Sequence, residues 1–169
     1  LDRPADVRFD PALGGGCLWD VGCYPISFAR VVAGAEPVSV QGVAVTGSTG
    51  IDLSFAAVLR FPGDVLAMAD ASFITSFRTG LEIVGTTGLL TVAHPFKPGV
   101  HETLRLTRGD AVEERTIEGR PLYVQQILDF SRAARGQMAP VVSLADTIST
   151  SSAFACWSGP DSDSVEKSS

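Results

Sequence analysis

Apolar and polar residues alternate with a period of two through much of residues 38–118, and short turn sequences divide this region into segments. The clearest segment has apolar residues at every second position: Leu53, Phe55, Ala57, Leu59 and Phe61. Such alternation is typical of β-strands that bury one face. Pro62-Gly63 turns the chain directly afterwards, and a second extended run, Val65–Thr75, follows. The pattern therefore predicts an antiparallel hairpin.

The same reasoning predicts further strands on both sides of this hairpin, and their connections are short. These strands cover Val38–Thr46, Gly80–Val84, Leu89–Ala93, Leu104–Thr107 and Ala111–Ile117. Glycine-containing turns separate the later ones. About seven strands with short connections predict one large, mainly antiparallel sheet.

Before the strands, apolar residues recur at roughly helical spacing. They are Leu18, Val21, Phe28, Val31 and Val32. Gly34 follows as a C-terminal stop signal. Pro25 lies inside this stretch, where it removes a backbone donor and clashes with the preceding turn. We therefore expect a helix kinked at Pro25, or two helical pieces that meet there.

Two more helices are expected after Pro121. In the first, Tyr123, Ile127, Phe130 and Ala134 share one face, and Gly136 ends the run. The segment Ser143–Asp146 has the form of a capping box that opens the last helix, with Ile148, Phe154 and Ala155 facing inward. Together the elements predict an α+β fold, a large open and mainly antiparallel sheet with helices packed on one face.

The other sheet face is predicted to be unusually apolar. It carries Val43, Val45, Val58, Leu66, Met68 and Ile74. Because a sheet covered on one side leaves its other side to water or to a partner, these residues favour a partner.

Composition restricts the class of protein further. The chain has 169 residues, enough for one domain, with a hydrophobic fraction of 45% and a net charge of −6. This balance excludes wholesale disorder and argues against a nucleic-acid surface. No apolar run is long enough for a transmembrane helix. Three cysteines without a C-x-x-C pair, Cys17, Cys23 and Cys156, are typical of buried thiols in a reducing, cytoplasmic compartment.

Several common chemistries lack their motifs. There is no G-x-S-x-G, no phosphate loop and no complete dinucleotide-binding βαβ unit. The two histidines, His94 and His101, have no zinc spacing and are expected as solvated loop residues. No metal site is predicted.

One pair of residues could move protons. Asp20 and Tyr24 are four positions apart, so on a helix they share a face, and Gly22 between them lets a chain segment or a ligand approach. A phenol titrates near pKa 10 and needs a nearby cation to act at neutral pH. The alternative is structural: Tyr24 is a core aromatic residue and Asp20 caps a helix.

Residues 8–25 read RFDPALGGGCLWDVGCYP, which resembles the G-G-G-x-L-x-D-x-G-x-[HY] segment of the Gfo/Idh/MocA oxidoreductases. The resemblance continues through 29–30, 34–37, 81–88, 123–133 and 142–146. It implies that residues 1–158 are the C-terminal substrate-binding and dimerisation domain, with 159–169 a flexible polar tail. The N-terminal Rossmann half of the family is not in this sequence, so the fragment alone is expected to be inactive.

The resemblance also implies an activity: NAD(P)-dependent hydride transfer at CH–OH groups of sugars or diols, in a homodimer formed through the sheet face. NADP or NAD would be bound mainly by the Rossmann half, whose lysine would lie beside the pair. Asp20 and Tyr24 match the family's two site positions and are the expected catalytic residues. Arg8, Trp19 and Gly22 are weaker candidates for the vicinity of substrate or cofactor. The alternative is a non-catalytic dimerising remnant or scaffold of the same family.

Overall fold

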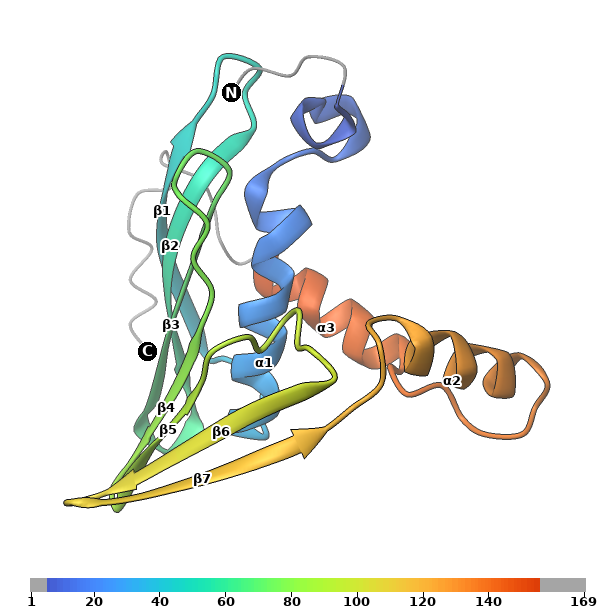
Figure 1. The fold of residues 1–169 in the computed structure, drawn as a ribbon. Helices are drawn as coiled ribbons and strands as arrows, with labels where there is room; N and C mark the ends of the chain where they lie inside the picture. Colours follow the sequence, from blue (N-terminus) through green and yellow to red (C-terminus); the bar gives the residue numbers. More distant parts are fainter. Residues whose placement is uncertain (1–5, 156–169) are drawn as a thin grey trace. The chain divides into compact units, whose positions relative to one another are not determined.

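The computed structural model describes residues 6–155, and these fall into two compact units (Figure 1). The first unit consists of the chain up to Thr75 together with the segment from Ser143 onward. The second unit is Ser76–Val142. Among the described residues, no helix is long and apolar enough to cross a membrane.

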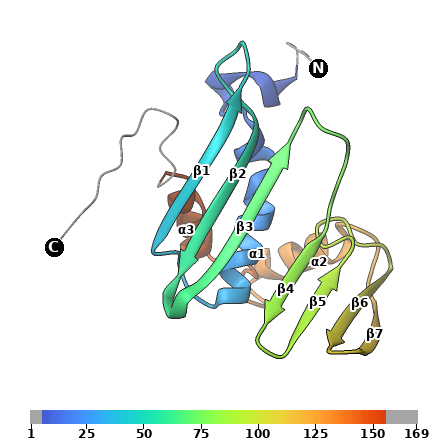
Figure 2. The same cartoon turned by 90° about the vertical axis from the view of Figure 1, so that its left-hand side faces the viewer.

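The first unit is built on a three-stranded antiparallel sheet in the order β1 (Ser39–Thr46), β2 (Asp52–Phe61) and β3 (Val65–Ser72). Its two faces differ as the alternation predicts. The inner face carries buried Phe55, Ala57, Leu59, Phe61 and Ala69. Helices α1 and α3 of this unit lie behind the sheet when its outer face is viewed (Figure 2).

The chain enters this sheet through a series of short helices. Two 3₁₀ turns, Val7–Phe9 and Pro11–Leu13, precede a π-helix, Leu18–Gly22, which runs directly into α1 (Cys23–Ala33). The expected meeting of two helical pieces is thus confirmed, and the junction lies two residues before Pro25. Pro25 has no N–H group, so it cannot donate the i→i−4 hydrogen bond of an α-helix. The π-helix just before it has a wider turn and a different hydrogen-bond pattern, which accommodates the missing donor. Gly34 ends α1 in the left-handed conformation, at φ 63°.

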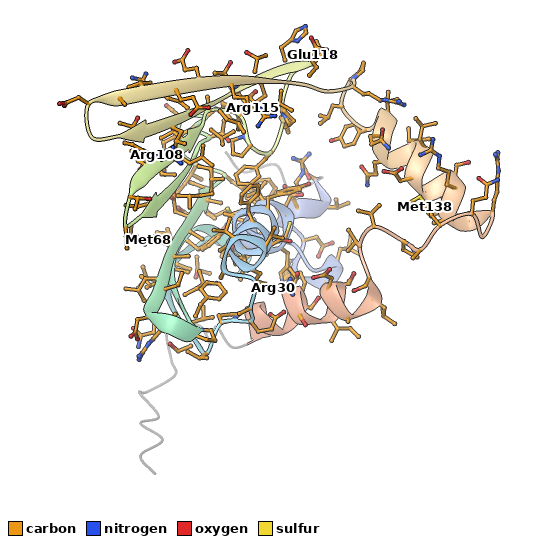
Figure 3. All side chains as sticks on the ribbon, turned by 90° about the horizontal axis from the view of Figure 1, so that it is seen from below. Arg30, Met68, Arg108, Arg115, Glu118 and Met138 are labelled. Carbon is orange, nitrogen blue, oxygen red and sulfur yellow. The ribbon has the colours of Figure 1, made fainter. Side chains whose placement is uncertain are left out.

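The core of the first unit joins these helices to the inner face. Cys17, Leu18 and Ile26 pack with Phe55, Ala57, Leu59, Phe61 and Ala69 in one apolar cluster. The outer face, by contrast, is open. The six apolar residues expected there are all exposed, from 44% for Val58 and Ile74 through Val45, Leu66 and Val43 to 88% for Met68. Met68 projects from the side of the sheet away from α1 (Figure 3).

The second unit holds a four-stranded antiparallel sheet and one helix. Its strands follow the order β4 (Leu81–Gly85), β5 (Gly88–Val92), β6 (His101–Arg108) and β7 (Ala111–Glu118), and α2 covers Val124–Ala134. Ile83, Leu90 and Leu106 stand in one cross-strand row and are partly buried. Three residues of the expected α2 face, Tyr123, Ile127 and Phe130, are at least 61% exposed.

The structure confirms the predicted α+β class, with two differences in detail. The described strands form two hydrogen-bonded sheets rather than one, because no strand pairing joins β3 to β4. Ile148, expected to face inward, is 56% exposed, so that prediction is wrong. Cys156 and the predicted tail, residues 159–169, lie outside the described residues, as do the side chains of Phe154 and Ala155.

Candidate functional site

Asp20 and Tyr24 both lie on the solvent side of the helical run that starts at Leu18. The Asp20 side chain is 38% exposed and Tyr24 is 52% exposed. Their neighbours Leu18 and Gly22 are buried. The core-aromatic alternative for Tyr24 therefore fails, because half of this residue remains in contact with solvent.

Three consecutive glycines shape the loop before this helix. Gly14 and Gly16 have φ of +72° and +128°, which other residues rarely adopt. At Gly15 a Cβ would lie 2.6 Å from the Arg8 carbonyl oxygen and 2.8 Å from that of Asp10. The amides of Gly15 and Gly16 donate to these same carbonyls, of Asp10 and Arg8, each at 2.9 Å. Since these donors are already used, the loop does not fit the diphosphate of a dinucleotide.

The folded loop brings Arg8 towards the site. Its Nη1 lies 4.0 Å from Oδ2 of Asp20, and its Nε lies 3.1 Å from Oδ1 of Asp6. The Arg8 side chain is 54% exposed. A guanidinium between two carboxylates neutralises part of the local negative charge and keeps one edge open to a polar ligand.

The two weaker helical candidates differ in their surroundings. Trp19 is 50% exposed and stands next to Asp20 on the π-helix. Gly22 is buried, and a Cβ on it would lie 2.5 Å from Cε1 of Phe55. The chain segment that approaches Gly22 is therefore strand β2, which explains the glycine by packing.

One residue of this region, Asp52, could not be identified as part of the site from the sequence. Asp52, at the start of β2, accepts a hydrogen bond from the Leu18 amide at 2.6 Å. Burial raises the pKa of the Asp52 carboxyl, while the amides of Leu18, Asp52 and Cys17 oppose that rise. The contact joins positions 34 residues apart, so no local pattern could have indicated it.

The two described cysteines lie beside this region. Cys17 is fully buried, and burial together with Asp52 and Asp20 raises the pKa of its thiol to about 12. Burial also raises the pKa of Cys23, which is partly exposed. Both thiols therefore stay protonated at neutral pH and are poor nucleophiles.

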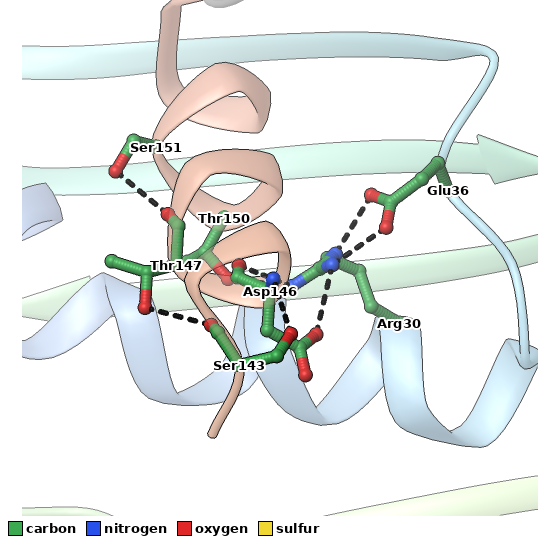
Figure 4. A network of polar contacts seen from close by, with 7 residues as sticks. All are labelled: Arg30, Glu36, Ser143, Asp146, Thr147, Thr150 and Ser151. Carbon is green, nitrogen blue, oxygen red and sulfur yellow. Dashed lines mark hydrogen bonds and ion pairs between the residues drawn. The ribbon is translucent and has the colours of Figure 1, made fainter. Parts of the chain in front are cut away.

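A network of polar contacts centred on the buried Arg30 holds α1 to α3 (Figure 4). Arg30 is only 7% exposed and binds Glu36 through two hydrogen bonds, Nε to Oε2 at 2.8 Å and Nη2 to Oε1 at 2.6 Å. Its other contacts are to Asp146 and Thr150 of α3. The network fixes the helix that carries Tyr24 against its neighbours.

Metal binding finds no support in residues 6–155. These residues contain no group of three or more His, Cys, Asp or Glu side chains that could hold an ion. His94 is 61% exposed and lies 3.4 Å from Glu102, and His101 is also exposed. The exposed carboxylate, phenol and guanidinium suit polar substrate hydroxyls and the reacting end of a cofactor instead.

Comparison with known proteins gives the class that this geometry suits. The sequence-family model of the GFO/IDH/MocA C-terminal domain matches residues 1–91 of this chain. The chain therefore belongs to the GFO/IDH/MocA family and carries its C-terminal domain.

Two relatives and one solved structure illustrate the family. Over 135 residues the chain is 31% identical to the dTDP-3,4-didehydro-2,6-dideoxy-alpha-D-glucose 3-reductase of Streptomyces violaceoruber, covering 77% of this chain and 39% of the relative. Over 150 residues it is 27% identical to D-xylose 1-dehydrogenase (NADP(+)) 2 of Haloferax volcanii, covering 88% and 46%. The 3-ketoreductase KijD10 from Actinomadura kijaniata, solved with NADP and TDP-benzene, superposes with a TM-score of 0.83 at 21% identity. That match covers 94% of this chain and 51% of the other.

Proposed function

We propose that this chain is the substrate-binding half of an NAD(P)-dependent oxidoreductase that acts on CH–OH groups of sugars or diols. The main observation in support is that Asp20 and Tyr24 are both exposed on one helical run, and that Nη1 of Arg8 lies 4.0 Å from Oδ2 of Asp20. The chain spans about half the length, or less, of the relatives described above. The other half, which includes the dinucleotide cradle, is proposed to precede this domain.

NAD(P), bound mainly by the other half, would supply the hydride acceptor for the carbinol carbon in oxidation and the hydride donor in reduction. Tyr24 takes the hydroxyl proton in oxidation and gives it back to the carbonyl oxygen in reduction. Asp20 accepts a hydrogen bond from a neighbouring substrate hydroxyl. It also attracts the lysine expected from the other half, whose positive charge assists proton transfer by Tyr24. Arg8 limits the negative charge around Asp20 and orients its carboxylate.

The cofactor is proposed to be NADP, with NAD as the other choice. A D-xylose dehydrogenase among the relatives is named for NADP(+), and the KijD10 structure contains NADP. In this chain the amides of Gly15 and Gly16 are occupied, so the cofactor phosphates belong to the other half. Trp19, next to Asp20 on the π-helix, is proposed to contact the sugar or the nicotinamide.

Two features are proposed for the whole protein. The apolar outer face of β1–β3, including Val43, Leu66 and Met68, is the contact surface of a homodimer. The compartment is the cytoplasm, because the cysteines are few and the two described ones are free. The competing function, a non-catalytic dimerising scaffold, needs this same face but makes no use of Tyr24.

Turnover of the whole protein separates the two functions, and replacement of Tyr24 tests the role of that residue. In the protein expressed with its cofactor-binding half, Tyr24→Phe should lower kcat by about 100-fold or more, because general acid–base catalysis contributes that much. The matched control is Tyr123→Phe, which removes the same oxygen from the other tyrosine, 61% exposed in the second unit. Equal turnover in both variants would contradict the role proposed for Tyr24, whereas no turnover in the unsubstituted whole protein would contradict the enzymatic proposal and favour the scaffold.

A further inference from the structure

The π-helix that carries Asp20 has no capping side chain of its own. Its N-cap residue is Cys17, which makes no side-chain cap hydrogen bond. The first amides of any helix need acceptors, because no preceding turn supplies them. Here the acceptor comes from a distant part of the chain, since Oδ2 of Asp52 lies 2.6 Å from the Leu18 amide nitrogen.

The pairing of β1 with β2 changes register next to Asp52. Val45 pairs with Ser54, but Thr46 pairs with Asp52, so Leu53 is an extra residue in β2. In strict alternation Asp52 would share the outer face with Ala56 and Val58. A bulge of this kind interrupts the alternation, so the side chain of Asp52, just before the extra residue, faces the side opposite to the one that strict alternation assigns to it. The carboxylate is thereby directed to the inner face, where the π-helix packs.

The glycine loop leaves room for the same carboxylate. A Cβ on Gly16 would lie 3.2 Å from Cγ of Asp52 and still closer to Oδ1. Gly16 also accepts the Asp20 amide through its carbonyl at 3.1 Å. The absence of a side chain at Gly16 therefore leaves space for the Asp52 carboxylate. Asp52 binds the Leu18 amide and the Gly16 carbonyl binds the Asp20 amide, so both residues hold the turn that presents Asp20.

We propose that Asp52 is a positioning residue for the reaction: it anchors the start of the helix that presents Asp20 and Tyr24 to β2, the central strand of its sheet. The inference rests on the proposed function for those two residues. Asp52 itself contacts backbone and no reacting atom. Its carboxylate at the helix start adds a favourable interaction with the helix dipole.

Amide hydrogen exchange tests the anchor without any assay of activity. In Asp52→Ala, peptides covering residues 17–24 should exchange at least about tenfold faster, because a capped amide has lost its acceptor. Peptides from β3 should keep their protection. Asp52→Asn should restore much of the protection, since an amide oxygen can accept the same bond. Asp110→Asn, in the turn between β6 and β7, is the control for loss of a carboxylate.

Kinetics of the same variants test the positioning role. With the cofactor-binding half present, Asp52→Ala should lower kcat by about tenfold with a smaller change in KM, because small displacements of reacting groups are costly. Asp52→Asn should recover most of kcat, and Asp110→Asn all of it. If Asp52→Ala does not fold, the contrast with Asp52→Asn decides: protection at 17–24 and kcat close to those of the unsubstituted protein show that an oxygen acceptor at this position is sufficient and support the anchor, whereas lost protection at 17–24 in Asp52→Asn overturns it.

Each failure points to a different claim. Unchanged exchange at 17–24 in Asp52→Ala overturns the anchor. Faster exchange with unchanged kcat overturns the positioning role, while the anchor stands. No turnover in the unsubstituted whole protein overturns the proposed function, full turnover in Tyr24→Phe overturns the role of Tyr24, and in either case the exchange data still decide whether Asp52 fixes the helix.

Discussion

Arg30 and Glu36 form a two-point ion pair, with Nε–Oε2 and Nη2–Oε1 distances of 2.8 Å and 2.6 Å. Arg30 is buried on α1, whereas the Glu36 side chain is 54% exposed in the connection to β1. The hydrogen bonds from Arg30 hold the pKa of Glu36 below its ordinary value near 4.5. This pair ties the end of the site helix to the start of the sheet.

Glu36→Gln should lower the free energy of unfolding by about 1 kcal/mol at pH 7, a small value because the exposed partner is screened by solvent. The stabilisation is complete above the unfolded pKa of Glu36 and is lost as pH falls through the lower folded pKa. The two proteins should therefore approach each other in stability below about pH 4. Urea unfolding at several pH values measures this, with Glu113→Gln as control. A difference independent of pH would contradict the ionic explanation.

Gly22→Ala should destabilise the first unit by about 1–3 kcal/mol, because overpacking a core forces side chains off their rotamers. The added methyl would meet Cε1 and Cζ of Phe55 at 2.5 Å and 2.6 Å. Phe55→Leu in the same chain should recover part of the loss. Thermal unfolding of the two single variants and the double variant measures the coupling, and strictly additive losses would count against a direct contact.

The alternation of apolar residues, together with glycine-containing turns, predicted all seven strands. In β2 the period of two corresponds to the burial of one face, whereas every residue of β7 is exposed. The division into two sheets could not be predicted in this way. It depends on whether β3 and β4 exchange hydrogen bonds, and side-chain patterns carry no information about that pairing. The π-helix was likewise hidden, since its apolar residues also suit α-helical spacing.

The site was predicted only as far as its parts are local in sequence. Asp20 and Tyr24 are four residues apart on a helical run, so their common solvent side followed from spacing. Asp52 was missed because the bulge at Leu53 reverses the face that alternation assigns to it. The importance of Asp52 comes from its tertiary hydrogen bond with the Leu18 amide, which the sequence pattern does not show.

Cys17 should resist alkylation in the folded protein, because its thiol is fully buried and has a pKa of about 12. At pH 8 only about one thiol in 10⁴ would be ionised, and the thiolate is the reactive form. Cys23, which is partly exposed, should react slowly but measurably. Mass spectrometry after iodoacetamide treatment, with and without urea, gives the extent at each position. Rapid labelling of Cys17 before unfolding would show that this core opens.

Met68→Asp should break the proposed homodimer. Met68 is 88% exposed and pairs across the sheet with Val58, so the two form a continuous apolar patch on the outer face. A carboxylate placed there would be buried without a partner in a dimer, which should weaken association by about 100-fold or more. Sedimentation velocity over a range of concentrations measures the shift.

Val141→Asp supplies the control, because Val141 is also apolar and 70% exposed but lies outside both sheets. The same charge there should leave the dimer intact, since Val141 is not one of the residues of the outer face of β1–β3. Two equally monomeric variants would show that added charge, rather than the location of Met68, causes dissociation. If both variants remain dimeric, the contact surface of the homodimer lies on another face of the protein. Only the pairing of a monomeric Met68→Asp with a dimeric Val141→Asp assigns the homodimer to the apolar face on which Val58 and Met68 lie side by side.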